Sequence, residues 1–175
     1  MRADGNIVLI GMPGAGKSTV GVLLAKHLGL DFVDTDLLIQ RADGRRLQEI
    51  VDEDDYHELR RLEEAAILGI EARGAVIATG GSAVYSARAM EHLRGLGTIV
   101  HLRASLPLLA SRIDDYGRRG IANASGQTLA DIFAERTPLY ERHADIAVDV
   151  DGRPPAAIVR AVARALRTRA AATRR

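Results

Sequence analysis

The chain has 175 residues, of which 47% are hydrophobic and 27% are charged, a composition typical of one globular domain with its own core. A net charge of +1 and an aromatic content of 3% give no basis for binding nucleic acid or a membrane surface. The absence of cysteine excludes disulfide bonds and thiolate metal sites, and it favours a reducing compartment. The first apolar run is too short for a signal peptide or a membrane span, so we expect a cytoplasmic protein.

A glycine-rich loop is the first motif along the chain. Residues 6–10 are apolar and rich in β-branched side chains, which predicts a buried strand, and residues 20–28 have a helical pattern. Between them, residues 11–18 read G-x-x-x-x-G-K-S, the phosphate-binding P-loop. Glycine lets this backbone wrap around a phosphate, and Gly16 begins a helix whose N–H groups and dipole favour an anion.

The polar residues of this loop have separate roles in the hypothesis. Lys17 is expected to place its charge on the β- and γ-phosphates of ATP, and the Ser18 hydroxyl is expected to ligate Mg²⁺. A chance glycine-rich turn is the alternative, but strand, lysine, serine and helix occur here in the required order. The candidate nucleotide-binding residues are Gly14, Ala15, Gly16, Lys17, Ser18 and Thr19.

The remainder of the chain alternates short apolar runs with helical patterns. Further strands are predicted over residues 31–34, 75–78, 98–102 and 145–149. Helices with both ends defined are predicted over residues 35–42, 86–96, 105–113 and 127–142. A short helix is predicted to begin at residue 47, and a longer one to run from residue 54 or 55 to about 73. The last helix is predicted to begin at residue 154. This alternation predicts an α/β fold of three layers, α/β/α, with a five-stranded parallel sheet covered on both faces.

The domain organisation is expected to be simple. No linker interrupts the pattern, so residues 1–175 are predicted to form a single domain. Residues 114–126 combine arginine, asparagine, serine and glycine, which predicts an irregular polar loop. From about residue 168 the last helix is expected to dissolve into a disordered basic tail.

Two aspartates, Asp34 and Asp36, follow the second predicted strand. Ligands of an open parallel sheet bind beyond the carboxyl ends of its strands, and residues two apart on a strand point the same way. Beside Lys17 and Ser18, one carboxylate suits a metal ion and the other an acceptor hydroxyl. We assign Asp34 to Mg²⁺ and Asp36 to the hydroxyl. The alternative is that one of them only caps the following helix.

Residues on the later elements suggest an acceptor site. Gly80 and Gly81 follow the third strand, where they either admit a ligand close to the backbone or form a plain turn. Arg60 and Glu63 share one helix face and can pair, in a site or as a surface ion pair. Arg136 lies on a face predicted to be buried, where it needs either a protein carboxylate or a substrate carboxylate.

Together these residues resemble the shikimate kinases, small-molecule kinases of the P-loop class with a nucleoside-monophosphate-kinase-like fold. The resemblance runs from residue 7 to about residue 166. In chain order, the motifs that carry it are Gly11–Thr19, Asp34–Asp36, Leu59–Glu63, Gly80–Val84 and Arg136–Tyr140. Their order and spacing are more specific than the P-loop alone.

The resemblance implies an enzyme that phosphorylates the 3-hydroxyl of shikimate with ATP, giving shikimate 3-phosphate and ADP in the pathway to chorismate and the aromatic amino acids. It places shikimate between Asp36, Arg60, Gly81 and Arg136, with Asp36 on ring hydroxyls and the two arginines on the carboxylate. Glu63 would orient Arg60.

The resemblance also implies roles for residues outside these motifs. The loop at 114–126 would be a lid whose Arg118 stabilises the transferring charge. Arg112 and Arg153 would flank the adenine, and Leu47 would line the acceptor pocket. The catalytic residues would then be Lys17, Asp36 and Arg118.

The sequence departs from the family pattern at the acceptor pocket and the lid. Leu59 and Val51 stand where the family has aromatic residues, and Ser82 replaces a third glycine. The lid reads Arg118-Arg119-Gly120-Ile121 in place of an arginine-proline-leucine run, so either arginine could be the lid arginine.

Two alternative functions stay open at this point. One is a kinase for another small carboxylated polyol, such as gluconate. The other is a catalytically silent nucleotide-binding partner protein, although such a protein would not need Lys17, both aspartates and a lid arginine. A short chain with one small sheet is expected to be a monomer, with small-molecule substrates and no nucleic-acid or membrane partner.

Overall fold

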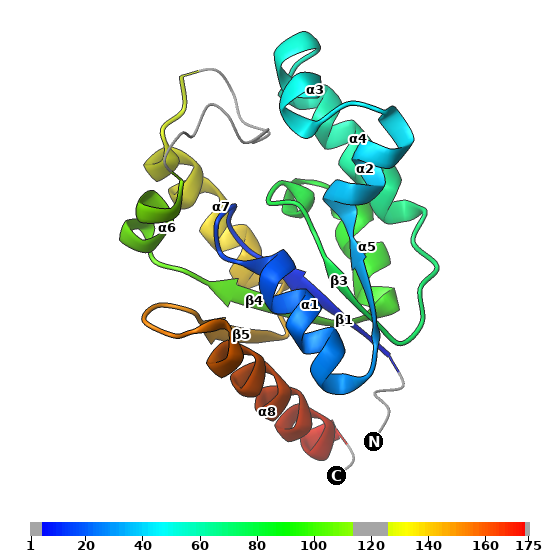
Figure 1. The fold of residues 1–175 in the computed structure, drawn as a ribbon, viewed down its shortest axis with the longest axis vertical. Helices are drawn as coiled ribbons and strands as arrows, with labels where there is room; N and C mark the ends of the chain where they lie inside the picture. Colours follow the sequence, from blue (N-terminus) through cyan, green and yellow to red (C-terminus); the bar gives the residue numbers. More distant parts are fainter. Residues whose placement is uncertain (1–4, 114–125, 174–175) are drawn as a thin grey trace.

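The fold is built on a single five-stranded sheet (Figure 1). The computed structural model describes residues 5–113 and 126–173. All neighbouring strands are parallel, in the order β2-β3-β1-β4-β5. The strands are β1 (Asn6–Ile10), β2 (Asp31–Asp34), β3 (Ala75–Ala78), β4 (Gly97–Arg103) and β5 (Ile146–Asp149). The predicted parallel sheet is therefore confirmed, with strand boundaries within one residue of those expected.

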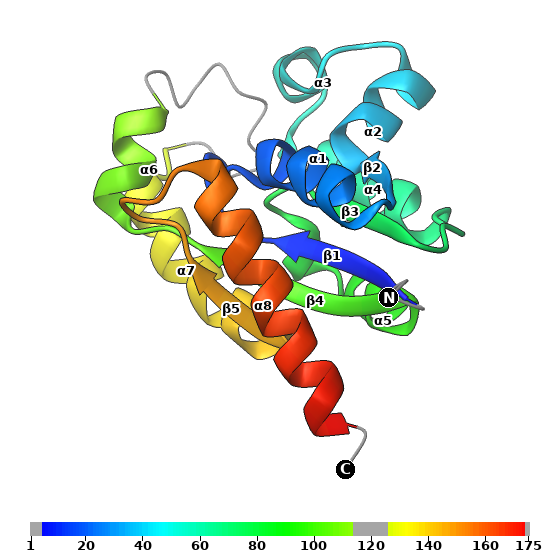
Figure 2. The same ribbon diagram turned by 60° about the horizontal axis from the view of Figure 1, so that its bottom comes forward.

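Helices cover both faces of the sheet, as the pattern predicts. Figure 2 shows α1 and α8 on one side and α5 and α7 on the other, while α2, α3 and α4 pack against one another beside β2 and β3. The helices are α1 (Lys17–Leu28), α2 (Thr35–Asp43), α3 (Leu47–Glu53), α4 (Tyr56–Leu68), α5 (Ala87–Leu96), α6 (Leu106–Arg112), α7 (Leu129–His143) and α8 (Pro155–Thr173), with a 3₁₀ turn η1 (Ala83–Tyr85).

Two helices end at different places from those predicted. Helix α4 stops at Leu68, before the expected end near residue 73, because Gly69 follows as a poor helix former. Helix α8 continues to Thr173, past residue 168 where a disordered tail was expected. Its last turns are alanine-rich, and Arg169 donates to Asp145 at 2.6 Å, which ties this end to the residue before β5. Within the described residues, no helix is long and apolar enough to cross a membrane.

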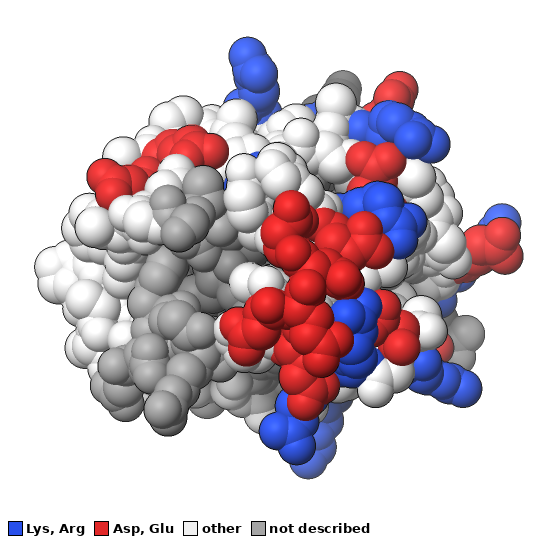
Figure 3. Space-filling view, turned by 90° about the horizontal axis from the view of Figure 1, so that it is seen from above, with Lys and Arg blue, Asp and Glu red and all other residues white. Residues whose placement is uncertain are grey.

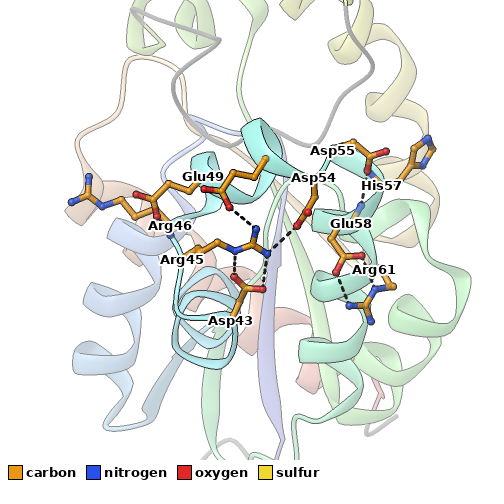
Figure 4. A network of polar contacts seen from close by, with 10 residues as sticks. Asp43, Arg45, Arg46, Glu49, Asp54, Asp55, His57, Glu58 and Arg61 are labelled. Atoms are coloured by element: carbon orange, nitrogen blue, oxygen red, sulfur yellow. Dashed lines mark hydrogen bonds and ion pairs between the residues drawn. The ribbon is translucent and has the colours of Figure 1, made fainter.

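A salt-bridge network holds the turn between α2 and α3 (Figure 4). Arg45 donates to Asp43 at 2.6 Å, to Glu53 at 3.0 Å and to Asp54 at 2.9 Å. The hydrogen bond from Arg45 is the main cause that lowers the pKa of Asp43. Figure 3, seen from above, shows acidic side chains gathered over this part of the molecule. The exposed acidic residues of α3 and the turn after it are Glu49, Asp52, Glu53, Asp54 and Asp55, the α3 acidic patch.

Asn6 is a buried polar residue that anchors the start of the central strand. Every residue of β1 is buried. The Asn6 amide donates to the carbonyls of Ala72 at 2.6 Å and Leu96 at 3.2 Å, and its carbonyl accepts from the Ala75 N–H at 2.9 Å. These bonds fix the register of β1 against its neighbours, because Ala75 begins β3 and Leu96 directly precedes β4. On the β4 side, Asn6 pairs directly with Gly97.

The first prediction concerns this close approach of β1 and β4. A Cβ at position 97 would lie 2.5 Å from the carbonyl carbon of Asn6, so Gly97→Ala must push the strands apart. We expect the free energy of unfolding, measured by urea titration, to fall by about 1–3 kcal/mol. Gly95→Ala is the matched control: no atom lies within 4 Å of its added Cβ, and helix α5 should gain roughly 0.5–1 kcal/mol. Equal stability of the two variants would contradict the prediction.

Candidate active site

A cavity of about 720 Å³ gathers most of the predicted site residues. The P-loop, α2, α4, the turn after β3 and α7 all contribute to its wall, together with the end of α6 and the start of α8. Of the residues predicted to bind ATP or shikimate, those lining it are Gly14, Ala15, Gly16, Lys17, Ser18, Thr19, Asp36, Gly81, Arg112, Arg136 and Arg153. Leu47, predicted to line the acceptor pocket, lines it as well. Residues from all parts of the chain therefore share one space.

The P-loop has the local geometry that its glycines predict. Gly14 and Gly16 adopt positive φ angles of 83° and 91°, a region that side-chain-bearing residues avoid. Lys17 is buried, and its ammonium donates to the carbonyls of Gly11 at 2.8 Å and Met12 at 3.0 Å. Burial lowers the pKa of Lys17 to about 8, against the opposing effect of nearby carboxylates. Arg112 donates to the Gly14 carbonyl at 3.0 Å and so joins α6 to the loop.

The two aspartates after β2 differ in their placement. Asp34 caps α2, because its carboxylate accepts from the Asp36 N–H at 3.0 Å. The capping alternative is thus realised by Asp34, whose side chain does not line the cavity. Asp36 does line it. Burial, with a smaller contribution from Asp34, raises the pKa of Asp36 to about 6, although Lys17 lowers it.

Glu63 lies inside the protein rather than on its surface. It is 3% exposed and accepts a hydrogen bond from the Ser82 hydroxyl, so the surface ion-pair alternative is wrong. A Cβ at Gly80 would meet the Glu63 carboxylate and lie 3.1 Å from a carboxylate oxygen of Asp36. Burial raises the pKa of Glu63 to about 7, Ser82 opposes this, and Asp36 adds to it. Ser82 is thus the partner of a buried acid, a role that its motif position alone did not indicate.

The turn after β3 is fixed to two other elements. Both the N–H and the hydroxyl of Thr79 donate to the Leu9 carbonyl, at 3.2 and 3.1 Å. The Gly80 N–H donates to the Thr35 hydroxyl at 2.9 Å. The turn that carries Gly81 is therefore bonded to the end of β1 and to the first residue of α2.

Arg136 lies in the cavity wall although it is 1% exposed. Its Nε donates to the hydroxyl of Tyr85 at 3.2 Å, and a Cβ at Gly81 would lie 3.1 Å from its Nη1. The hydroxyl of Tyr140 donates to the Gly81 carbonyl at 2.5 Å, which holds the glycine against this arginine. Arg60 does not line the cavity; its guanidinium carbon lies 3.8 Å from the centre of the Tyr85 ring.

Some expectations fall outside the described structure. Arg118, Arg119 and the expected lid at 114–126, apart from Gly126, lie outside the described residues. No cluster of three or more histidine, aspartate or glutamate side chains suited to a metal ion occurs in residues 5–113 and 126–173.

Comparison with known proteins assigns the chain to a family. A family model described as shikimate kinase matches residues 13–167. The chain belongs to the shikimate kinase family. Shikimate kinases from Pseudomonas syringae and Pseudomonas aeruginosa are 38% identical over 157 residues and 39% identical over 165 residues. These alignments cover 88% and 93% of this chain, and 91% and 96% of the relatives.

Solved structures of shikimate kinases share the whole fold. One from Acinetobacter baumannii, in complex with shikimate, superposes with a TM-score of 0.88 at 27% identity and 96% coverage of both chains. One from Aquifex aeolicus gives 0.80 at 28% identity, covering 94% of this chain and 98% of the other. The resemblance seen in the sequence is confirmed, and the P-loop kinase fold with it. The chain is an ATP-dependent kinase that phosphorylates shikimate.

The second prediction concerns the buried Glu63. The folded protein keeps a proton on this group up to about pH 7, whereas the unfolded chain loses it near 4.5. The free energy of unfolding of the ligand-free protein should therefore fall as pH rises from about 4.5 to 7, with Glu63 contributing about 3 kcal/mol. Glu63→Gln should flatten this slope in urea titrations from pH 4.5 to 8, and the exposed Glu71→Gln should not. An unchanged slope in Glu63→Gln would contradict the prediction.

Proposed function

We propose that this cavity holds ATP and shikimate side by side and that Asp36 directs the 3-hydroxyl of shikimate at the γ-phosphate. The observation that supports it is that Lys17, Asp36 and Arg136 line one cavity. A phosphate-binding cation, an acidic group and a carboxylate-binding cation therefore lie around the same space. A phosphorylated donor and a carboxylated acceptor need this set of groups. The enzyme acts as a cytoplasmic monomer in this proposal.

The nucleotide half of the site follows from the P-loop. Backbone N–H groups around Gly14 and Gly16 bind the phosphates, and Lys17 adds its charge to the β- and γ-phosphates. Arg112 and Arg153 flank the adenine, with Arg112 already bonded to the loop through Gly14. Arg118 completes the set by stabilising the charge of the group in transit.

The residues present fit a magnesium ion that arrives with ATP. Ser18 lines the cavity at the start of α1, and the absence of a three-residue acidic or histidine cluster in the described residues suits an ion held largely by phosphate and water. Ser18 and Asp34 would hold it. When bound, Mg²⁺ would neutralise the negative charge that develops on the phosphates. Because Asp34 caps α2 and its side chain does not line the cavity, it would hold the ion through a water molecule.

Asp36 acts on the acceptor. Its raised pKa of about 6 still leaves it ionised above neutral pH, so it can accept a hydrogen bond from the 3-hydroxyl. As the hydroxyl oxygen bonds to the γ-phosphorus, the bond from that phosphorus to the bridging oxygen of ADP breaks, and the hydroxyl proton passes to the Asp36 carboxylate. Bond formation lags in phosphoryl transfer, so the larger contribution of Asp36 is to orient the oxygen.

The carboxylate of shikimate is assigned to Arg136. This arginine lies in the cavity wall beside Gly81, and its planar fork suits a bidentate carboxylate contact. Arg60 adds a second cation against the ring of Tyr85, although it does not itself line the cavity. The acceptor would therefore be fixed at both ends, by its hydroxyl and by its carboxylate.

The experiment that tests the function is an ADP-release assay with ATP, Mg²⁺ and one of shikimate, quinate or gluconate, or no acceptor. We expect turnover with shikimate at least about a hundredfold above the others, because buried polar groups left unpaired by a wrong acceptor cost binding energy. A preference for gluconate would favour the alternative sugar-acid kinase. ADP release that does not respond to any acceptor would overturn the assignment.

The third prediction concerns Asp36 itself. Asp36→Asn should lower kcat by about two to four orders of magnitude, because it removes the proton acceptor at the 3-hydroxyl. The affinity for ATP, measured by calorimetry, should stay within about threefold, because the phosphates are bound by the P-loop. Asp31→Asn, at an exposed position of β2, is the matched control. Turnover of Asp36→Asn equal to that of the control would remove Asp36 from the mechanism.

A further inference from the structure

Tyr85 is held rigidly at the edge of the acceptor site. It ends the η1 turn that follows Gly80–Ser82, and its N–H donates to the Ser82 carbonyl at 3.0 Å. The next residue, Ser86, caps α5 by accepting from the Ala89 N–H at 3.0 Å. The Tyr85 backbone is therefore bonded on one side to the glycine turn and continues on the other into a capped helix.

The side chain of Tyr85 contacts both arginines assigned to the acceptor carboxylate. The guanidinium carbon of Arg60 lies 3.8 Å from the ring centre, and that of Arg136 lies 5.2 Å from it. The Nε of Arg136 also donates to the Tyr85 hydroxyl at 3.2 Å. Two cations from helices α4 and α7 are thus held against one neutral side chain.

The chemistry of a phenol suits this position better than that of a carboxylate. A carboxylate between the arginines would pair with them directly, whereas an aromatic ring attracts a cation and leaves its charge in place. The Glu135 carboxylate also attracts both arginines and offsets part of their charge. The Tyr85 hydroxyl donates to Glu135, which leaves its oxygen to accept from Arg136. Glu135 also accepts a hydrogen bond from the Gln127 side chain at 2.9 Å. Glu135 therefore acts only as an acceptor, which keeps the Tyr85 hydroxyl as a donor to Glu135 and an acceptor from Arg136.

We propose that Tyr85 is a positioning residue that makes the acceptor site selective for a carboxylate, by holding Arg60 and Arg136 together on one neutral ring. The proposal rests on the assignment of these arginines under the proposed function. Bonded through Nε, Arg136 keeps its guanidinium plane in one orientation, with Nη1 beside Gly81 in the cavity wall. Arg60, stacked on the ring, raises the positive potential at the same place.

The two parts of the Tyr85 side chain can be tested separately. Tyr85→Phe removes only the hydroxyl that orients Arg136, and it should raise the KM for shikimate about three- to tenfold, the effect of one hydrogen bond. Tyr85→Leu also removes the ring under Arg60, and it should raise the KM about ten- to fiftyfold. In both variants kcat should stay within about threefold and the KM for ATP within about twofold, because only acceptor binding is weakened.

The preference for shikimate over an uncharged analogue should change if Tyr85 positions the arginines, and should stay the same if Tyr85 only supports the fold. The probe is the methyl ester of shikimate, which keeps the ring hydroxyls but carries no negative charge. The ratio of kcat/KM for shikimate to that for the ester should fall at least about fivefold in Tyr85→Leu, because the cationic site is then less well formed.

Ser86→Ala is the matched control. It loosens the same segment, because it removes the α5 cap and the hydrogen bond from Ser86 to Glu64 at 2.5 Å, but no contact with either arginine is lost. Its thermal stability should fall, while its KM for shikimate and its ester selectivity should stay within about twofold of the unmodified protein. The Phe variant keeps the test decisive if Tyr85→Leu does not fold.

Three outcomes separate this inference from the function on which it rests. The role of Tyr85 would be overturned if the KM of Tyr85→Leu for shikimate stayed within twofold of that of the unmodified protein. If Tyr85→Leu does not fold, the same criterion applies to Tyr85→Phe. Equal changes in Ser86→Ala and the Tyr85 variants would also overturn this role. If Arg136→Lys, run in the same assay, leaves the KM unchanged, the carboxylate assignment itself fails, and the role of Tyr85 fails with it.

Discussion

The hydrogen bonds of Thr79 to the Leu9 carbonyl hold the two halves of the site together. Strands β1 and β3 are parallel neighbours, so their carboxyl ends meet at one edge of the sheet. One end leads into the P-loop and the other into the turn with Gly80 and Gly81. Because the Gly80 N–H also donates to Thr35, the start of α2 and its Asp36 are drawn to the same edge. The phosphate site and the acceptor site therefore share a single backbone junction.

The charges around this junction balance one another inside the protein. Lys17, Asp36, Glu63 and Arg136 are two cations and two acids, and their effects on one another appear in the pKa values of the first three. Burial favours the neutral forms of Lys17, Asp36 and Glu63, and in each case a nearby opposite charge counteracts it. The pKa values of about 8 for Lys17 and about 7 for Glu63 place both groups close to neutral pH. The protonation states of Lys17 and Glu63 can therefore change when an anionic substrate binds.

Structural features that depend on a few neighbouring residues could be predicted from the sequence. Features that depend on contacts between helices or turns distant in the sequence could not. The P-loop and its helix are set by spacing over a few residues, and the structure places them as expected. Of the two aspartates after β2, Asp36 lines the cavity as expected, whereas Asp34 caps α2. The burial of Glu63 depends on Ser82, which is 19 residues away and bonds to it across the core. Tyr85 contacts arginines from two different helices, so no single stretch of sequence marks it. The predicted end of α4 was wrong because the apolar periodicity continues to Ile70, beyond Gly69 where the helix stops.

The α3 acidic patch has a consequence for how substrates arrive. ATP and shikimate are both anions. Arg45 pairs with Glu53 and Asp54 of the patch, and the other carboxylates of the patch repel anions within a Debye length of roughly 8–10 Å at moderate salt. Arg112 at the end of α6 and Arg153 just before α8 line the cavity and attract the same anions. A chain with a net charge of only +1 therefore has a strong local asymmetry. Electrostatic steering would bring both substrates in along the α6 and α8 side and away from α3.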